Sequence, residues 1–180
     1  KTYFGGLKAV IWQDVIHGTI LVLGTTLMFV AVLIKSGGWE NVSDNAASIG
    51  EADMLSVMNI TPGEILIYLL TLAVFQFVRQ DLWQRVWAAG SLKTASSGYW
   101  VSMVIAVAIG VFAVAIGVFG KYGLQIDNIN PVLIYYGVID NVFPFALVVV
   151  MIVVLLAAVI SSADSFLLAG ASSIVNDIIR

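Results

Sequence analysis

Five serines lie along one side of the apolar stretch that runs from Ala158 to Asn176 near the end of the chain. On a helix with 100° per residue, these serines share a sector of about 120° with two alanines and an asparagine. The members of this stripe are Ala158, Ser161, Ser162, Ser165, Ala169, Ser172, Ser173 and Asn176. Asp164 lies at one edge of it. The stripe places oxygen atoms along a helix that is otherwise apolar.

Hydroxyl and carbonyl oxygens on such a helix are suited to binding a hard cation. No water is available inside a bilayer to satisfy them, and Na⁺ prefers oxygen ligands to nitrogen or sulfur. Ser161 and Ser162 offer two hydroxyls, and a backbone carbonyl freed near Ala158 adds a third oxygen. We therefore expect a cation site on this helix. The alternative for each single serine is a hydrogen bond to the carbonyl one turn earlier, together with close helix packing.

The composition of the chain is that of an integral membrane protein. Of its 180 residues, 61% are hydrophobic and 11% charged, with a mean hydropathy of +1.03, whereas soluble domains carry about 25% charged residues. The absence of cysteine excludes a disulfide framework and thiolate metal sites, and a single histidine argues against a zinc or haem centre. The sequence offers no nucleophile–base pair and no metal-ligand cluster. We expect neither an enzyme nor a nucleic-acid-binding protein.

Four apolar stretches are long enough to cross a hydrocarbon layer of about 30 Å as helices. We expect all-α spans at about 11–34, 65–89, 99–120 and 144–176, joined by polar loops at 35–64 and 121–142. Lysines and arginines gather before the first span, around the turn at 85–98 and at the end of the chain. Because positive charge marks the cytoplasmic side, we expect both termini and this turn to be cytoplasmic and the two polar loops to be outside.

Asp14 lies inside the first expected span. An acidic residue at the centre of a membrane helix costs about 3 kcal/mol on insertion scales, so it needs a partner or a function. The simpler interpretation places Asp14 at the interface, paired with Lys8 or with water. His17 shares its helix face and is expected to be a packed, hydrogen-bonded neighbour, although a proton-coupled mechanism would need it because histidine changes charge near neutral pH.

Arg79 and Asp81 interrupt the second expected span. One interpretation is an interfacial cluster, in which Arg79 extends toward the headgroups and Asp81 pairs with Arg85. The other is a discontinuous helix whose free backbone groups and Arg79 face a central cavity, as at transporter binding sites. In the second case Arg79 would bind a solute carboxylate through two hydrogen bonds, with Gln76 and Gln80 as neighbouring candidates.

Three stretches carry a resemblance to one transporter family. They are GGLKAVIWQDVIHG at 5–18, QDLWQRVWAAGSLKTA at 80–95 and AAVISSADSFLLAGASSIVNDI at 157–178. In order and spacing they resemble the motifs GGxxAVxWTDxxQ, QRxxAAxSLKxA and SSxDSxLLxxSSxxxxDI of the sodium/solute symporter family. This family includes the sodium-coupled glucose, proline, pantothenate and sialic acid carriers. The last motif is the most specific of the three.

The resemblance implies a leucine-transporter-like architecture of ten core helices in two inverted repeats. This chain would be a fragment that holds the fifth to eighth of them. Ala158, Ser161 and Ser162 match the family's main Na⁺ site, whose other ligands would come from the first core helix. Ser165 and Asp14 match a second Na⁺ position in some members, or a lining of the ion's exit path. Arg79 stands near a solute-binding asparagine of the sugar carriers.

The function implied is Na⁺-coupled symport of a small polar organic solute by alternating access, with a carboxylate-bearing solute as one option. The expected location is the plasma membrane, and the expected partners are the solute, Na⁺, lipid and the remaining helices of the full-length protein. Two alternatives stay open. One is a symporter-like sensor module of a signalling protein, and the other is a proton-coupled carrier that works without Na⁺.

Overall fold

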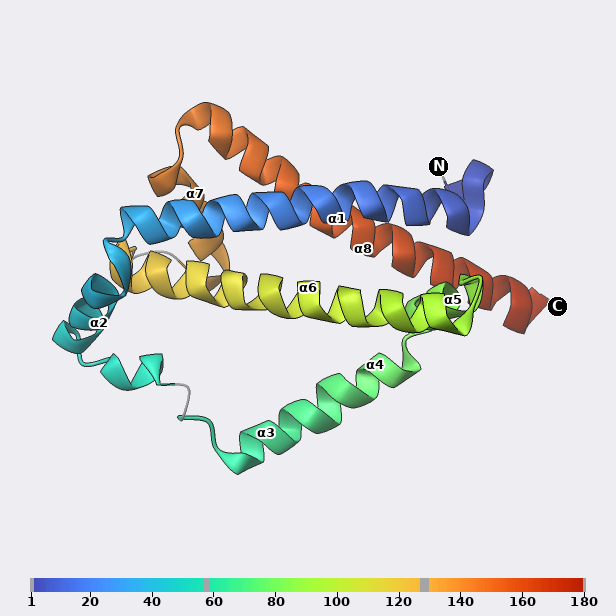
Figure 1. The fold of residues 1–180 in the computed structure, drawn as a ribbon, viewed down its shortest axis with the longest axis horizontal. Helices are drawn as coiled ribbons and strands as arrows, with labels where there is room; N and C mark the ends of the chain where they lie inside the picture. Colours follow the sequence, from blue (N-terminus) through green and yellow to red (C-terminus); the bar gives the residue numbers. More distant parts are fainter. Residues whose placement is uncertain (1, 57–58, 127–129, 180) are drawn as a thin grey trace. The chain divides into compact units, whose positions relative to one another are not determined.

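The computed structural model describes residues 2–56, 59–126 and 130–179, and each regular element in these ranges is a helix (Figure 1). The all-helical fold expected from the sequence is therefore confirmed. The elements in chain order are α1 (Thr2–Lys35), α2 (Gly38–Ser48), η1 (Ala52–Leu55), α3 (Pro62–Tyr68), η2 (Leu69–Ala73), α4 (Val74–Val78), α5 (Gln80–Ala88), α6 (Leu92–Val118), η3 (Phe119–Gly123), η4 (Pro131–Leu133), α7 (Ile134–Val142), α8 (Phe145–Ser173) and η5 (Ile174–Ile179).

Three helical stretches in the described ranges are long and apolar enough to cross a membrane by themselves. They are Gly6–Lys35 in α1, Leu92–Gly123 in α6 and η3, and Phe145–Ser173 in α8. The stretches expected at 11–34 and 99–120 lie inside the first two. The connections expected as polar loops also contain helices, α2 in 35–64 and α7 in 121–142. Hydropathy locates the apolar part of a helix, whereas capping and local hydrogen bonds decide where the helix ends.

The fourth candidate span is a broken helix. It starts with a capping box, in which Thr61 N donates to Glu64 Oε2 at 2.8 Å and Glu64 N donates to Thr61 Oγ1 at 3.3 Å. A π-helical turn, η2, follows α3, and α4 ends at Val78. Arg79 has an extended backbone (φ −67°, ψ 109°), and α5 continues at an angle of 47°. Of the two interpretations of this region, the discontinuous helix describes the backbone.

The chain divides into two compact units. Unit 1 contains Lys1–Gly18, Ile60–Met103 and Ala158–Arg180, and unit 2 contains Thr19–Asn59 and Val104–Ala157. The three long helices α1, α6 and α8 contribute residues to both. Unit 2 holds the main cluster of buried apolar side chains. Unit 1 holds the residues that the sequence singles out for chemistry.

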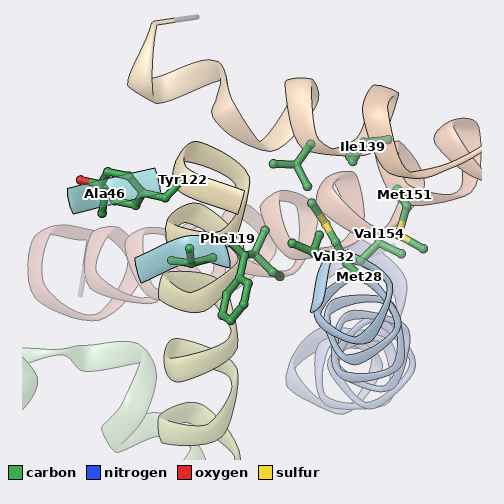
Figure 2. Packing of buried hydrophobic residues seen from close by; sticks show 11 residues of the cluster. Met28, Val32, Ala46, Phe119, Tyr122, Ile139, Met151 and Val154 are labelled. Atoms are coloured by element: carbon green, nitrogen blue, oxygen red, sulfur yellow. The ribbon is translucent and has the colours of Figure 1, made fainter. Parts of the chain in front are cut away.

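The core of unit 2 contains buried apolar side chains from α1, α2, α6, η3, α7 and α8. Figure 2 shows Met28 and Val32 of α1 beside Met151 and Val154 of α8, with Ile139 of α7 close by. All of these side chains are buried.

A glycine permits the close approach of two of these helices. A Cβ atom at Gly24 of α1 would lie 2.5 Å from Val154 Cγ2, which is closer than real side chains pack. Gly24 therefore lets α1 and α8 approach closely in unit 2.

Polar contacts fasten α2 and η1 to η3 in the same unit. Asn45 Nδ2 donates to the carbonyl of Tyr122 at 2.9 Å, and Tyr122 OH donates to Glu51 Oε2 at 2.7 Å. Lys121 Nζ also donates to Glu51. The hydrogen bonds from Lys121 and Tyr122 hold the pKa of the Glu51 carboxyl below its usual value. These contacts secure the long connection between α1 and α3 to the end of the α6–η3 stretch.

Candidate functional site

All residues that the sequence proposes for the site belong to unit 1, and they come from three segments distant in the chain. The first part of α1, the break between α4 and α5, and the last part of α8 supply them. They are Asp14 and His17 from α1, Gln76, Arg79, Gln80 and Asp81 around the break, and Ala158, Ser161, Ser162, Asp164 and Ser165 from α8.

The three serines of the proposed ion site make two kinds of hydrogen bond. Ser162 Oγ donates to the carbonyl of Ala158 at 3.1 Å and Ser165 Oγ to the carbonyl of Ser161 at 3.0 Å, as expected for single serines on a helix. Ser161 Oγ instead donates to Asp14 Oδ1 at 2.5 Å. A hydroxyl that donates its hydrogen still carries two lone pairs, so these oxygens remain potential cation ligands.

Asp14 is paired with an arginine that the sequence did not assign to the site. Arg85 Nη2 donates to Asp14 Oδ2 at 2.6 Å and to Ser165 Oγ at 2.6 Å. The partner considered from the sequence was Lys8. The need for a positive charge near Asp14 was readable, because a carboxylate at membrane depth requires a partner. The basic residue that supplies this charge is set by the direction of α5 after the helix break, because α5 carries Arg85.

Arg79 and Asp81 form a second ion pair at the helix break. Arg79 Nε donates to Asp81 Oδ1 at 3.0 Å and Arg79 Nη2 donates to Asp81 Oδ2 at 2.6 Å. Arg79 Nη1 donates to Gln76 Oε1 at 3.3 Å. The Asp81 side chain is only 5% exposed, so the guanidinium compensates a nearly buried charge. Asp81 is thus bound to Arg79, in place of the Asp81–Arg85 pair weighed from the sequence.

Two further hydrogen bonds link α8 to other segments of unit 1. Gln13 Nε2 of α1 donates to Asp164 Oδ2 at 2.6 Å, and Ser173 Oγ donates to Gln80 Oε1 at 2.7 Å. His17 differs from these residues, because its buried Nδ1 has no hydrogen-bond partner within the described part of the chain.

The sequence comparison then decides the family. The model of the sodium:solute symporter family matches residues 1–180. The chain belongs to the sodium:solute symporter family. No curated protein and no solved structure matches it. Members of this symporter family are membrane transporters that couple solute transport to sodium, and they are not enzymes.

Two cavities adjoin the polar residues of this symporter chain. The smaller has a volume of about 110 Å³ and is lined by Arg79, Asp81, Arg85, Ser161, Ser162, Ser165 and Phe166. The larger, of about 340 Å³, lies between the α5 segment and the beginning of α6, where Thr94, Tyr99 and Ser102 contribute polar groups. Arg79, Asp81 and Arg85 line both cavities.

The lining of the smaller cavity combines oxygen atoms with two positive charges. Three serine hydroxyls of α8 and the Asp81 carboxylate line it together with the guanidinium groups of Arg79 and Arg85, and Asp14 is hydrogen-bonded to Ser161. In the ranges that the structure describes, no three residues of the types His, Cys, Asp and Glu gather as a metal-binding group. Oxygen ligands with few formal charges are the type that Na⁺ uses, in line with the sodium coupling of the symporter family.

Proposed function

We propose that this chain forms part of a symporter that couples the uptake of a small polar organic solute to Na⁺ by alternating access. The observation that carries the proposal is the position of Ser161 and Ser162. Both line the cavity of about 110 Å³ and follow the long apolar first half of α8.

The main Na⁺ position is assigned to the Ser161 and Ser162 hydroxyls and the Ala158 carbonyl. Ser162 Oγ and the Ala158 carbonyl are joined by a hydrogen bond of 3.1 Å, so the two oxygens lie close enough to bind one ion. Ser161 Oγ donates a hydrogen bond to Asp14, so the lone pairs of the serine oxygen are left for the cation. The remaining ligands would come from helices of the full-length protein outside this chain. Asp14 and Ser165 are the groups proposed for a second ion position, with Asp164 as a neighbouring acidic group, and in this structure Arg85 donates hydrogen bonds to both.

The solute is proposed to bind near the helix break, with Arg79, Gln76 and Gln80 as contacts. Arg79 lines the larger cavity, whose volume of about 340 Å³ suits a small organic molecule. Three of the five guanidinium N–H groups donate to Asp81 and Gln76, and two remain to bind an acceptor on the solute. A solute carboxylate would use these two, while Asp81 keeps the local charge balanced.

Coupling follows from a difference in Na⁺ affinity between two conformations. Na⁺ on the α8 oxygens would stabilise the outward-facing state that binds solute, and loss of Na⁺ would favour the inward-facing state. In the proposed orientation in the plasma membrane, the N-terminus, the 85–98 turn and the C-terminus face the cytoplasm. Unit 1 would then lie on the side where the ion is released.

Replacing Ser162 with alanine in the full-length protein tests the proposal. We expect Ser162→Ala to raise the Na⁺ concentration for half-maximal solute uptake by about tenfold or more, since hydrogen-bond-like contacts to a charge contribute roughly 1.5–3 kcal/mol. Thr26→Ala is the matched control, because Thr26 Oγ1 also donates to the carbonyl one turn earlier, that of Val22 at 2.7 Å, and Thr26 belongs to unit 2, which holds none of the proposed ion or solute contacts.

Two outcomes would contradict sodium coupling at this position. An unchanged Na⁺ dependence in Ser162→Ala would remove Ser162 from the site. Uptake that persists when choline replaces Na⁺ would favour a proton-coupled carrier, for which the buried and unpartnered Nδ1 of His17 is the candidate proton acceptor.

A further inference from the structure

Arg85 places a guanidinium nitrogen against oxygen atoms of the kind a metal cation would use. Its Nη2 lies 2.6 Å from Asp14 Oδ2 and 2.6 Å from Ser165 Oγ. Ser161 completes this set, because it donates to the second oxygen of the same carboxylate at 2.5 Å. The oxygen set on α1 and α8 therefore already holds a positive charge, which is supplied by the chain itself.

Na⁺ and Arg85 cannot hold Asp14 and Ser165 at the same time. Both are cations, and both need the oxygen atoms that face Nη2. Two like charges within about 4 Å repel each other, and a single carboxylate cannot neutralise both. The charge of Arg79 is already balanced by Asp81, to which its guanidinium donates two hydrogen bonds.

Arg85 has room to leave this position. Its side chain is 42% exposed, compared with 20% for Asp14. It also lines both the cavity next to the serines and the larger cavity between the α5 segment and α6. Open space therefore adjoins the guanidinium on the side of each cavity.

We propose that Arg85 is a tethered cation that competes with Na⁺ for Asp14 and Ser165. With Arg85 in place, the protein binds Na⁺ only at the Ala158–Ser161–Ser162 position, and Arg85 thereby sets the number of ions bound. The inference rests on the proposed function, because it assumes the main Na⁺ position on α8.

Equilibrium binding of radioactive Na⁺ to the purified full-length protein tests this role. We expect the wild type to bind one Na⁺ per protein at saturation and Arg85→Gln to bind two, because glutamine lacks the charge that excludes the second ion. Arg85→Lys keeps a cation at the site and should bind one. Arg85→Gln combined with Asp14→Asn should return to one, since the carboxylate that attracts the second ion is gone.

The outcomes separate the two proposals. One ion bound by both the wild type and Arg85→Gln overturns the role of Arg85 and leaves the main site intact. No ion bound by either protein overturns the sodium site as well. Should Arg85→Gln fail to fold, Asp14→Asn in the otherwise unchanged protein serves instead. It should still bind one Na⁺, and a loss of binding would show that Asp14 already holds the ion in the wild type.

Discussion

At the scale of single residues, unit 1 combines charges that neutralise each other in pairs. Arg79 compensates Asp81 and Arg85 compensates Asp14, while Asp164 accepts a hydrogen bond from Gln13. Pairing is required because an isolated charge at membrane depth is costly. At the proposed site, an ion would therefore compete with partners that these groups already have.

The Arg79–Asp81 pair gives a stability prediction at this scale. Asp81→Asn leaves a guanidinium without its carboxylate, so we expect the free energy of unfolding to fall by roughly 1–3 kcal/mol. The range is below that of a fully buried pair because the Arg79 side chain is 28% exposed. The apparent melting temperature of the purified full-length protein measures the effect.

The double variant Arg79→Gln, Asp81→Asn provides the control for this prediction. It removes both charges and should melt at a higher temperature than Asp81→Asn alone. Equal melting temperatures for Asp81→Asn and the wild type would show that the pair does not contribute to stability.

At the scale of helices, the break at Arg79 positions the charged side chains. A straight helix over 62–88 would carry Arg79, Asp81 and Arg85 along one continuous axis. The extended backbone at Arg79 and the angle of 47° between its two parts instead direct α5 separately from α4. As a result Arg85 reaches both α1 and α8, whereas Arg79 stays with Asp81 at the break. The discontinuity thus produces two separate ion pairs.

Helix packing in unit 2 gives a second prediction at this scale. Gly24→Ala places a Cβ atom 2.5 Å from Val154 Cγ2, and such overpacking costs about 1–3 kcal/mol. We expect a lower apparent melting temperature, with partial recovery when Val154→Ala is added to make room. Gly110→Ala is the matched control, since nothing lies within 4 Å of a Cβ atom at Gly110. A melting temperature of Gly24→Ala equal to that of Gly110→Ala would refute the close approach of α1 and α8 at Gly24.

At the scale of the whole molecule, the polar site and the main apolar core belong to different units. The proposed ion ligands are all in unit 1, and the cluster that includes Met28, Met151 and Val154 is in unit 2. The long helices α1, α6 and α8 contribute to both. The apolar core and the proposed ion ligands therefore lie in separate units, although both units contain parts of the same long helices. Effects of substitutions more than about 7–10 Å apart without shared partners are usually additive.

This separation predicts two distinct patterns in the full-length protein. Gly24→Ala should lower the melting temperature and leave the Na⁺ concentration for half-maximal uptake within about twofold of the wild type. Ser162→Ala should do the reverse, since its hydroxyl is exposed and bonded only within α8. Measuring both quantities for both variants checks the prediction. A parallel change of both quantities in either variant would mean that the two units are energetically coupled.

Much of the architecture was readable from the sequence because it depends on local and additive properties. Apolar runs such as 11–34 indicate spanning helices wherever they lie in the chain. The spacing of Ser161, Ser162 and Ser165 follows from helix geometry alone. The interruption at Arg79 was also visible, since two charged residues end an apolar run. These features were enough to indicate the helical fold, and the resemblance of the stretches at 5–18, 80–95 and 157–178 to known motifs indicated the family.

The pairing of charges was decided only by the tertiary structure. Asp14 had Lys8 as a nearby candidate and Asp81 had Arg85, but in the structure Arg85 binds Asp14 and Arg79 binds Asp81. A salt bridge depends on the distance between side chains in space, and the bend at Arg79 changes these distances without changing the composition. The sequence determined which groups need partners at membrane depth. The direction of α5 after the break determined which partners they have. Coulomb attraction weakens with distance, and the course of the backbone sets the distances between the charged groups.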